Sequence, residues 1–127
     1  MNIYEAATSR RAVRAFTDQP VPHETLERVL EHTRSDVPRH RPRLGRPQWA
    51  DLVMYLQTVM LLLRAEGLHS CPQMAWSQVR KTVAEIVARP DELILFCGMS
   101  IGFEDTSVSH PRTGRARLDD VVTFLGP

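Results

Sequence analysis

The sequence predicts an α+β fold, and the order of its elements is the main evidence. Apolar residues recur at helical spacing through the first two thirds of the chain, while an apolar run rich in β-formers comes late, at residues 92–103. The chain has no internal repeat and no heptad pattern. Helices followed by a late strand are typical of α+β proteins rather than of a repeated βαβ sheet.

Length and composition predict one globular domain over residues 1–127. Hydrophobic residues make up 43% and charged residues 24%, so disordered, collagen-like and coiled-coil chains are poor matches. The net charge of +1 gives no reason to expect a nucleic-acid partner. Because no apolar run reaches the roughly 18–20 residues that cross a bilayer, we expect no membrane partner. Two cysteines, Cys71 and Cys97, are too few for a disulfide scaffold, which favours reduced thiols and a cytoplasmic location.

The N-terminal part predicts two short helices joined by an extended segment. Apolar residues have helical spacing within residues 2–8. Residues 9–16, SRRAVRAF, alternate arginines with small or apolar residues and predict a loop or an extended segment. Pro22 suits the N-terminus of a helix over residues 23–34. The apolar face of that helix is formed by Leu26, Val29 and Leu30.

Residues 35–48 are the one linker-like stretch of the sequence. Three prolines and a glycine exclude regular structure there, and four arginines make it basic. The run RHRPRLGR is the only feature that favours a nucleic-acid or anion-binding module. Since short basic stretches are usually solvated connections, this interpretation is disfavoured.

The next residues predict the central helix. Residues 49–66 have a broad apolar face, so this helix is expected to be buried on most sides. Gly67 followed by an apolar residue predicts a helix stop with glycine in the left-handed conformation. A loop follows, and Ser77 is then a candidate N-cap for a helix over residues 78–88.

The C-terminal third predicts the sheet and a polar loop. Residues 92–103, ELILFCGMSIGF, are apolar on both faces, which is typical of an inner strand. Residues 105–117 predict an arginine-containing loop, and residues 118–125 a short helix or a final strand. A sheet needs at least two strands, and the sequence offers only one strong candidate.

Standard catalytic motifs are not found in the sequence. Gly98 and Gly102 fall inside the strand pattern rather than between a strand and a helix, so they do not form a dinucleotide fingerprint, and no P-loop is present. The five histidines show no pair at metal-ligand spacing on a helix. We therefore predict no metal and no catalytic side chain.

Two groups of arginines remain as candidate binding residues. Guanidinium groups bind phosphate in a bidentate manner, so two converging loops could hold one phosphate group. Solvated loop charges are the alternative, and composition alone favours it. The arginines are Arg10, Arg11 and Arg14 near the N-terminus, and Arg112, Arg115 and Arg117 near the C-terminus.

Four motifs in order carry a family resemblance. They are SRRAVRAF with PVPHETLERVLEH, then PQWADLVMYLQTVMLLLRAEGLHSCPQMAW, then ELILFCGMSIGFED, and finally SHPRTGRARLDDVVTF. Together they resemble the nitroreductase family of FMN-dependent oxidoreductases over about residues 2–34 and 47–125. The resemblance implies a reduced nitroreductase-like α/β/α fold with a small sheet, in an intertwined homodimer. It also implies FMN as cofactor and NAD(P)H as co-substrate.

The resemblance implies a flavin site made by both arginine groups and by the loop after Gly67. In the family, the first group and one C-terminal arginine contact the FMN phosphate and ribityl chain, and the loop places backbone groups beside the reactive N5 edge. Ala12 stands where the family usually has serine, so one hydroxyl hydrogen bond is missing. Carried over by position, the site residues are Arg10, Arg11, Ala12 and Arg115, with Arg14 and Arg112 as additions, and Gln73, Met74 and Ala75 in the loop.

The chain departs from the family pattern in the middle. Family members have an Asn-x-Gln-Pro-Trp flavin contact and further strands there, whereas this chain has a large internal deletion between about residues 35 and 47. Two functions stay open. One is an NAD(P)H oxidoreductase of reduced size that reduces a nitroaromatic, quinone or similar acceptor. The other is a catalytically degenerate flavin-binding or regulatory subunit that needs a larger flavoprotein partner. The short bridge also suits an exchange of segments between two chains.

Overall fold

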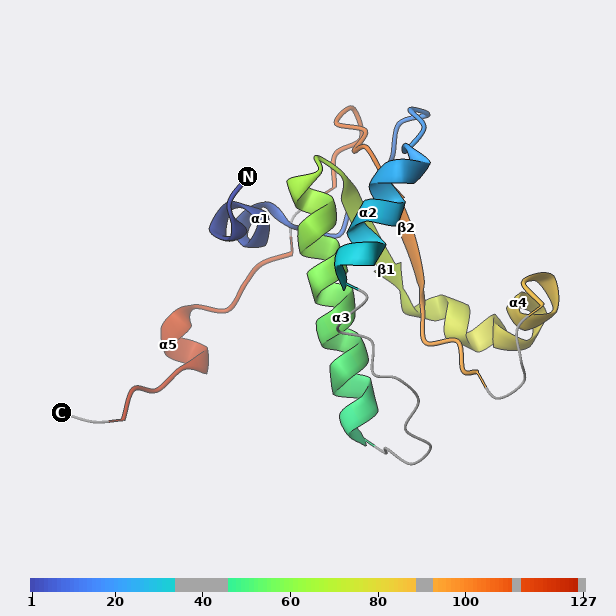
Figure 1. Cartoon of the computed structure of the whole chain (residues 1–127). Coiled ribbons are helices and arrows are strands. Elements are labelled where there is room, and N and C mark those ends of the chain that lie inside the picture. Colours follow the sequence, from blue (N-terminus) through green and yellow to red (C-terminus); the bar gives the residue numbers. More distant parts are fainter. Residues whose placement is uncertain (34–45, 89–92, 111–112, 126–127) are drawn as a thin grey trace.

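The computed structural model describes residues 1–33, 46–88, 93–110 and 113–125, whose arrangement is shown in Figure 1. The predicted α+β class is confirmed, because helices pack around a small two-stranded antiparallel sheet. In chain order the elements are α1 (Ile3–Ser9), α2 (His23–Thr33), α3 (Arg46–Ala65), β1 (His69–Gln73), the 3-10 helix η2 (Met74–Val79), α4 (Arg80–Ile86), β2 (Gly98–Gly102) and α5 (Leu118–Val121).

The first two helices begin at well-defined caps. The Asn2 side chain accepts a hydrogen bond from Glu5 N, and the Glu5 carboxylate accepts one from Asn2 N, both at 2.9 Å. This capping box satisfies two backbone donors at the start of α1. Helix α2 begins directly after Pro22, as predicted, and Thr25 N donates to Pro22 O at 3.0 Å.

One position on the apolar face of α2 was predicted wrongly. Val29 is buried and Leu26 packs against the core, but Leu30 is exposed. The buried position is taken instead by Thr33, which lies one helical turn beyond Val29. Its hydroxyl donates to Val29 O at 3.2 Å, so the polar group is satisfied inside the helix.

The predicted linker falls mostly outside the described residues. Residues 35–45, which include most of RHRPRLGR, are in this part of the chain. Its last three residues, 46–48, begin α3, so the exclusion of regular structure was wrong there. Pro47 is tolerated because the first turn of a helix does not use its N–H groups.

Helix α3 is central only in its second half. Val59, Met60 and Leu63 are buried, and α1, α2 and β1 all contact this helix. Val53 and Met54 are exposed, which contradicts the expectation of burial on most sides. Figure 1 shows the reason, since the first half of α3 extends beyond the elements that pack on the second half.

Gly67 ends the helical segment as predicted. Its φ is +80°, Gly67 N donates to Arg64 O at 3.0 Å, and Leu68 N donates to Leu63 O at 2.9 Å. These two bonds form a Schellman motif, in which glycine tolerates the left-handed conformation. Leu68 is buried and leads the chain into β1.

The sheet differs from the prediction in both strands. β1 pairs with β2 so that His69 lies opposite Gly102 and Gln73 opposite Gly98. Residues 69–73 were expected to be a loop. β2 is five residues long rather than residues 92–103, because a strand pairs only as far as its partner extends. Leu93 and Ile94 are exposed, so the start of that apolar run is not an inner strand.

The extended segment predicted over residues 9–16 lies at residues 10–17, since Ser9 still belongs to α1, and it adds to this sheet. Ala12 makes a parallel bridge with Ser70 of β1, and Phe16 makes an antiparallel bridge with Glu104 just after β2. The segment therefore contacts both strands and brings the first arginine group to the sheet.

The helix predicted over residues 78–88 begins earlier and ends earlier. It starts as η2 at Met74 and continues as α4 to Ile86. Ser77 is not an N-cap but lies inside η2, where its hydroxyl donates to Met74 O at 2.7 Å. Near the C-terminus the chain forms the short helix α5, one of the two predicted alternatives.

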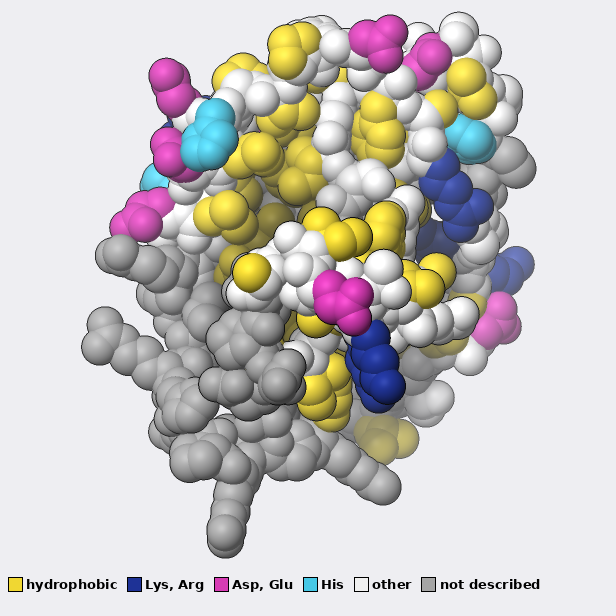
Figure 2. Space-filling model, turned by 90° about the vertical axis from the view of Figure 1, so that its right-hand side faces the viewer, with side chains coloured by type: hydrophobic (Ala, Val, Ile, Leu, Met, Phe, Trp, Pro, Cys, Tyr) yellow, Lys and Arg dark blue, Asp and Glu magenta, His cyan; other side chains and the backbone are white. Residues whose placement is uncertain are grey.

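The buried core lies where α2, α3 and the sheet meet. Val29, Val59, Leu63 and Leu68 form its centre, and Ile101 of β2 packs against them. Residues 74–88 and 113–125 extend away from this core (Figure 1). Figure 2 shows one face of the molecule, on which many hydrophobic side chains reach the surface among the charged ones.

The exposed surface is large for the mass. The chain has 10385 Å² of accessible surface, whereas a compact monomer of this size has about 6,900 Å². The exposed apolar side chains include Phe124 and Leu125 at the C-terminal end and Ile86 in α4.

Candidate flavin site

The N-terminal arginines alternate between two sides of the extended segment. Val13 is buried and Arg11 faces Glu104, whereas Ala12 and Arg14 are exposed and Arg10 is half-buried. Side chains of an extended segment alternate in this way, so positions 10, 12 and 14 share one side. Within the described part of the chain, neither Arg10 nor Arg14 has an ion-pair partner. These two guanidinium groups are therefore available to an anion.

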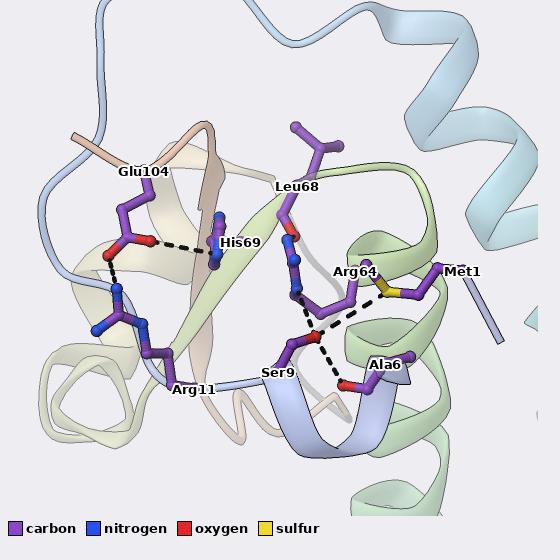
Figure 3. A network of polar contacts seen from close by, with 8 residues as sticks. All are labelled: Met1, Ala6, Ser9, Arg11, Arg64, Leu68, His69 and Glu104. Atoms are coloured by element: carbon purple, nitrogen blue, oxygen red, sulfur yellow. Dashed lines mark hydrogen bonds and ion pairs between the residues drawn. The ribbon is translucent and has the colours of Figure 1, made fainter. Parts of the chain in front are cut away.

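Arg11 has a different environment from Arg10 and Arg14. Its Nη2 forms an ion pair and hydrogen bond with Glu104 Oε1, and Glu104 Oε2 lies 3.4 Å from His69 Nε2 (Figure 3). The Glu104 side chain is only 12% exposed. Three segments, the extended one, β1 and the residues after β2, thus meet at one carboxylate.

The surroundings of His69 favour the uncharged form of its imidazole ring. Burial lowers the pKa of its imidazole, the positive charge of Arg64 lowers it further, and Glu104 opposes the shift. Nδ1 of His69 is buried and has no hydrogen-bond partner among the described residues. The ring therefore disfavours a proton at neutral pH, and Arg11 is the principal cation on Glu104.

Arg64 connects α1 to the start of β1. Its Nη1 donates to Leu68 O at 3.0 Å, and its Nε lies 3.5 Å from Ser9 Oγ. Ser9 Oγ in turn donates to Ala6 O at 3.5 Å, as Figure 3 shows. This network fixes the end of α1, from which the arginine segment continues.

Gln73, Met74 and Ala75 lie where β1 passes into η2. Gln73 ends the strand, and its side-chain oxygen accepts a hydrogen bond from Trp76 Nε1 at 2.7 Å. Met74 is exposed, and Ala75 follows it in the first turn of η2. The first N–H groups of a helix have no partner inside the helix, so this turn offers backbone donors.

The aromatic ring of Trp76 packs closely over the sheet. A Cβ built on Gly98 would lie 2.6 Å from Trp76 Cδ1, so a larger residue at this point of β2 would require the ring to move. Gly102, at the other end of β2, is covered in the same way by Phe16, because a Cβ built on Gly102 would lie 2.8 Å from Phe16 Cδ1. An isolated glycine in a strand often marks such a close approach.

The C-terminal arginine group is not brought to the N-terminal one in the described structure. Arg112 lies outside the described residues. Arg115 is exposed, and its Nη1 donates to Thr113 O at 3.0 Å. Among the described residues, no contact joins the Arg115 side chain to residues 10–14.

Sequence reasoning did not find Glu104 and His69. Glu104 is one acidic residue directly after an apolar run, and His69 is one histidine with no metal-ligand spacing, so neither has a distinguishing pattern. Their proximity depends on the pairing of β1 with β2, and β1 itself was not predicted.

The fold is that of FMN-dependent nitroreductases. A crystal structure of a mutant of the FMN and NADPH-dependent nitroreductase NfnB from Sphigopyxis sp. strain HMH matches with a TM-score of 0.85 and 25% identity. That match covers 99% of this chain and 100% of the other. NfnB from Mycobacterium smegmatis, solved in complex with NADPH, matches with a TM-score of 0.73 and 20% identity over 97% of each chain.

The sequence comparisons agree with this fold. The nitroreductase family model matches residues 7–43. A 4-nitrobenzoate reductase from Pseudomonas putida is 31% identical over 85 residues, which are 65% of this chain and 37% of that protein. A chloronitrobenzene nitroreductase from Comamonas testosteroni is 33% identical over 63% of this chain and 37% of that protein. The chain is thus similar to nitroreductases in sequence as well as in fold, and its alignments span little more than a third of these curated relatives.

The described residues contain no alternative cofactor or membrane element. They include no group of three or more side chains suited to a metal ion. No helix among them has the length and apolar character needed to cross a membrane. The arginine pair, by contrast, suits an anionic group such as the phosphate of FMN.

Proposed function

We propose that this chain binds FMN and acts as a nitroreductase-like oxidoreductase, which uses NAD(P)H to reduce a nitroaromatic, quinone or similar acceptor. The observation that carries the proposal is the structural match, over nearly the whole chain, with a nitroreductase described as FMN and NADPH-dependent. The names of the curated relatives support an aromatic nitro compound as the acceptor class.

Arg10 and Arg14 are the residues proposed to hold the FMN phosphate. They lie on one side of the extended segment and have no carboxylate partner among the described residues. Ala12 between them contributes only its backbone, since it has no hydroxyl. Arg112 and Arg115 are proposed as further phosphate contacts from the C-terminal loop.

The strand end at Gln73 is proposed to face the reactive edge of the flavin. Met74 and Ala75 would then supply backbone N–H donors, and the Trp76 contact fixes the Gln73 side chain. FMN, when bound, would accept a hydride from the nicotinamide and pass reducing equivalents to the acceptor. The protein's own task is to bind, orient and shield the reactants, so it needs no acidic or basic catalytic side chain.

A homodimer is proposed as the functional form. The accessible surface of the chain exceeds that of a compact monomer by about 3,500 Å². This difference is several times the roughly 800 Å² of surface that each partner buries in a standard interface. The C-terminal residues Phe124 and Leu125 are among the most exposed apolar side chains. Their cover is proposed to be a second copy of the chain, with segments exchanged between the two copies.

We also propose that residues 1–127 form one domain with an internal deletion between about residues 35 and 47. The end-to-end match with a solved nitroreductase, set beside the 37% coverage of the curated relatives, supports a shortened middle. The location is proposed to be cytoplasmic. Cys71 and Cys97 are free thiols, which agrees with a reducing compartment.

The second candidate function is a degenerate flavin-binding or regulatory subunit that needs a larger flavoprotein partner. The observation that favours it is the same limited coverage of the curated relatives. In this case the chain would bind FMN weakly or only together with the partner, and would not turn over alone.

The test is FMN titration of the purified chain, followed by NADPH oxidation with a nitroaromatic acceptor. We expect FMN binding and turnover in the wild type. The double variant Arg10→Met with Arg14→Met should weaken FMN binding by about 10- to 100-fold for each lost charged hydrogen bond. The matched control, Arg80→Met with Lys81→Met, removes two exposed positive charges from α4 and should change neither value.

Three outcomes separate the candidates. Binding with turnover supports the oxidoreductase. Binding without turnover, restored by a larger flavoprotein partner, supports the degenerate subunit. If the chain takes up no FMN under any of these conditions, both candidates are wrong.

A further inference from the structure

Both carboxylate oxygens of Glu104 lie close to side chains of other segments. Oε1 accepts from Arg11 Nη2, and Oε2 lies 3.4 Å from His69 Nε2 (Figure 3). The Glu104 side chain is 12% exposed and that of Arg11 is 35% exposed. Salt screens such partly buried pairs less than it screens surface pairs, so this contact is a firm link between the two segments.

Backbone hydrogen bonds fix the same extended segment on either side of this link. Val13 N donates to Ser70 O at 3.3 Å. Further on, Asp105 N donates to Ala15 O at 3.0 Å and Thr17 N donates to Phe103 O at 2.9 Å. Arg11 is thus the first attachment of the segment to the residues after β2, and it directly follows Arg10, whose own N–H donates to Ala6 O of α1 at 3.0 Å.

We propose that Arg11 is a positioning residue of the flavin site, and that its ion pair with Glu104 fixes the segment which presents Arg10 and Arg14 to the FMN phosphate. The inference rests on the proposed function above. It gives Arg11 a role different from the direct phosphate contact that the family resemblance implies.

Two observations support this division of roles. The positive charge of Arg11 is already neutralised by Glu104, and a phosphate brought to Arg11 would also approach that carboxylate. In an extended segment, moreover, Arg11 faces the opposite side from Arg10 and Arg14. One phosphate group can therefore meet Arg10 and Arg14 without breaking the Arg11–Glu104 pair.

The test compares FMN with riboflavin, which lacks the phosphate. The ratio of the two dissociation constants measures the phosphate contribution alone. The variants are Arg11→Met, Glu104→Met, the two combined, and the reversed pair Arg11→Glu with Glu104→Arg. Arg28→Met and Glu66→Met are matched controls, because this pair also joins two segments, 2.7 Å apart, but lies between α2 and the end of α3.

We expect each single variant to reduce the preference for FMN by about tenfold, as for coupled residues in one network. The combined variant should lose no more than either single variant, and the reversed pair should restore most of the preference. The control variants should keep the wild-type ratio. Amide exchange at Val13 and Thr17 should become faster in both single variants, because the segment loses its link.

Several results would overturn the inference. If Arg11→Met weakens FMN binding while Glu104→Met strengthens it or leaves it unchanged, Arg11 is a phosphate ligand. If neither variant changes the ratio or the amide exchange, the pair has no positioning role. If Arg11→Met does not fold, Arg11→Lys provides the same comparison, with a smaller expected loss. A wild type that binds neither flavin refutes the proposed function itself, whereas the first two results leave that function standing.

Discussion

The body of the molecule and its two arms differ in how completely they are packed. The body consists of residues 1–33, 55–73 and 98–110, and it contains the buried cluster around Leu63. The arms are residues 74–88 and 113–125, and none of their described elements contains a buried residue. The difference indicates that contacts within one chain account for the body, whereas the described residues provide little surface that covers the arms.

The same difference separates the polar contacts. In the body, the contacts of Arg11 with Glu104 and of Arg64 with Ser9 join segments that are distant in sequence. In the arms, the described polar contacts of Trp76, Ser77 and Arg115 all connect residues two or three positions apart. Long-range contacts hold a tertiary structure, while local ones only shape a turn, so the following predictions compare the two regions.

Removing a core side chain from the body should have the largest effect. Leu63 is 1% exposed, and Leu63→Ala should lower the free energy of unfolding by about 2–5 kcal/mol. Ile86→Ala in the arm is the matched control, since Ile86 is 77% exposed and should change stability by about 0.5 kcal/mol or less. Urea unfolding of both variants measures the difference. Equal losses would refute the distinction between body and arms.

The two glycines of β2 give a finer comparison. Gly102→Ala places a Cβ against Phe16 close to the point where its ring joins the backbone, so we expect a loss of about 1–3 kcal/mol. Gly98→Ala meets the half-exposed ring of Trp76, which can turn toward solvent, so its loss should be smaller. Thermal unfolding ranks the two, and the opposite order would mean that the Trp76 arm is as rigid as the body.

The C-terminal arm should matter for assembly more than for folding. Leu125 is 94% exposed, and replacing Phe124 and Leu125 with serine should leave monomer unfolding nearly unchanged. If a second chain covers them, each buried side chain contributes about 1.5–3 kcal/mol, and the dimer should dissociate about 10-fold or more readily. Sedimentation velocity across a concentration series checks this. An unaltered dimer would show that these residues are not at the interface.

The smallest expected effect is a pH dependence located in the body. The pKa of His69 is lowered in the folded chain by burial and by Arg64. The unfolded chain therefore binds a proton more readily, so stability should fall as the pH drops below the ordinary histidine pKa of about 6.5. His69→Gln should flatten the stability profile between pH 5 and about 7.5. A variant with the wild-type slope would assign the dependence to other groups.

Local patterns predicted much of the body. Pro22 marked the start of α2, Gly67 marked the end of α3, and the alternating arginines indicated the extended segment. Each of these depends on the conformational preferences of a few adjacent residues. The fold class followed from the order of such local elements.

The errors arose where distant pairing decides the outcome. β1 contains Pro72 and polar residues, so its strand character comes from its partner β2 rather than from its own sequence. The exposure of Leu30 and Val53 depends on which neighbours cover α2 and α3. For the same reason the Glu104 contact was missed, although Arg10 and Arg14, which have no ion-pair partner among the described residues, were identified from their motif.

The central claim is tested most directly by an absorbance spectrum of the purified chain together with its mass in solution. We expect flavin absorbance, before or after FMN is added, in a species of twice the chain mass of 14.5 kDa. A colourless monomer that takes up no added FMN would contradict both the proposed flavin site and the proposed dimer.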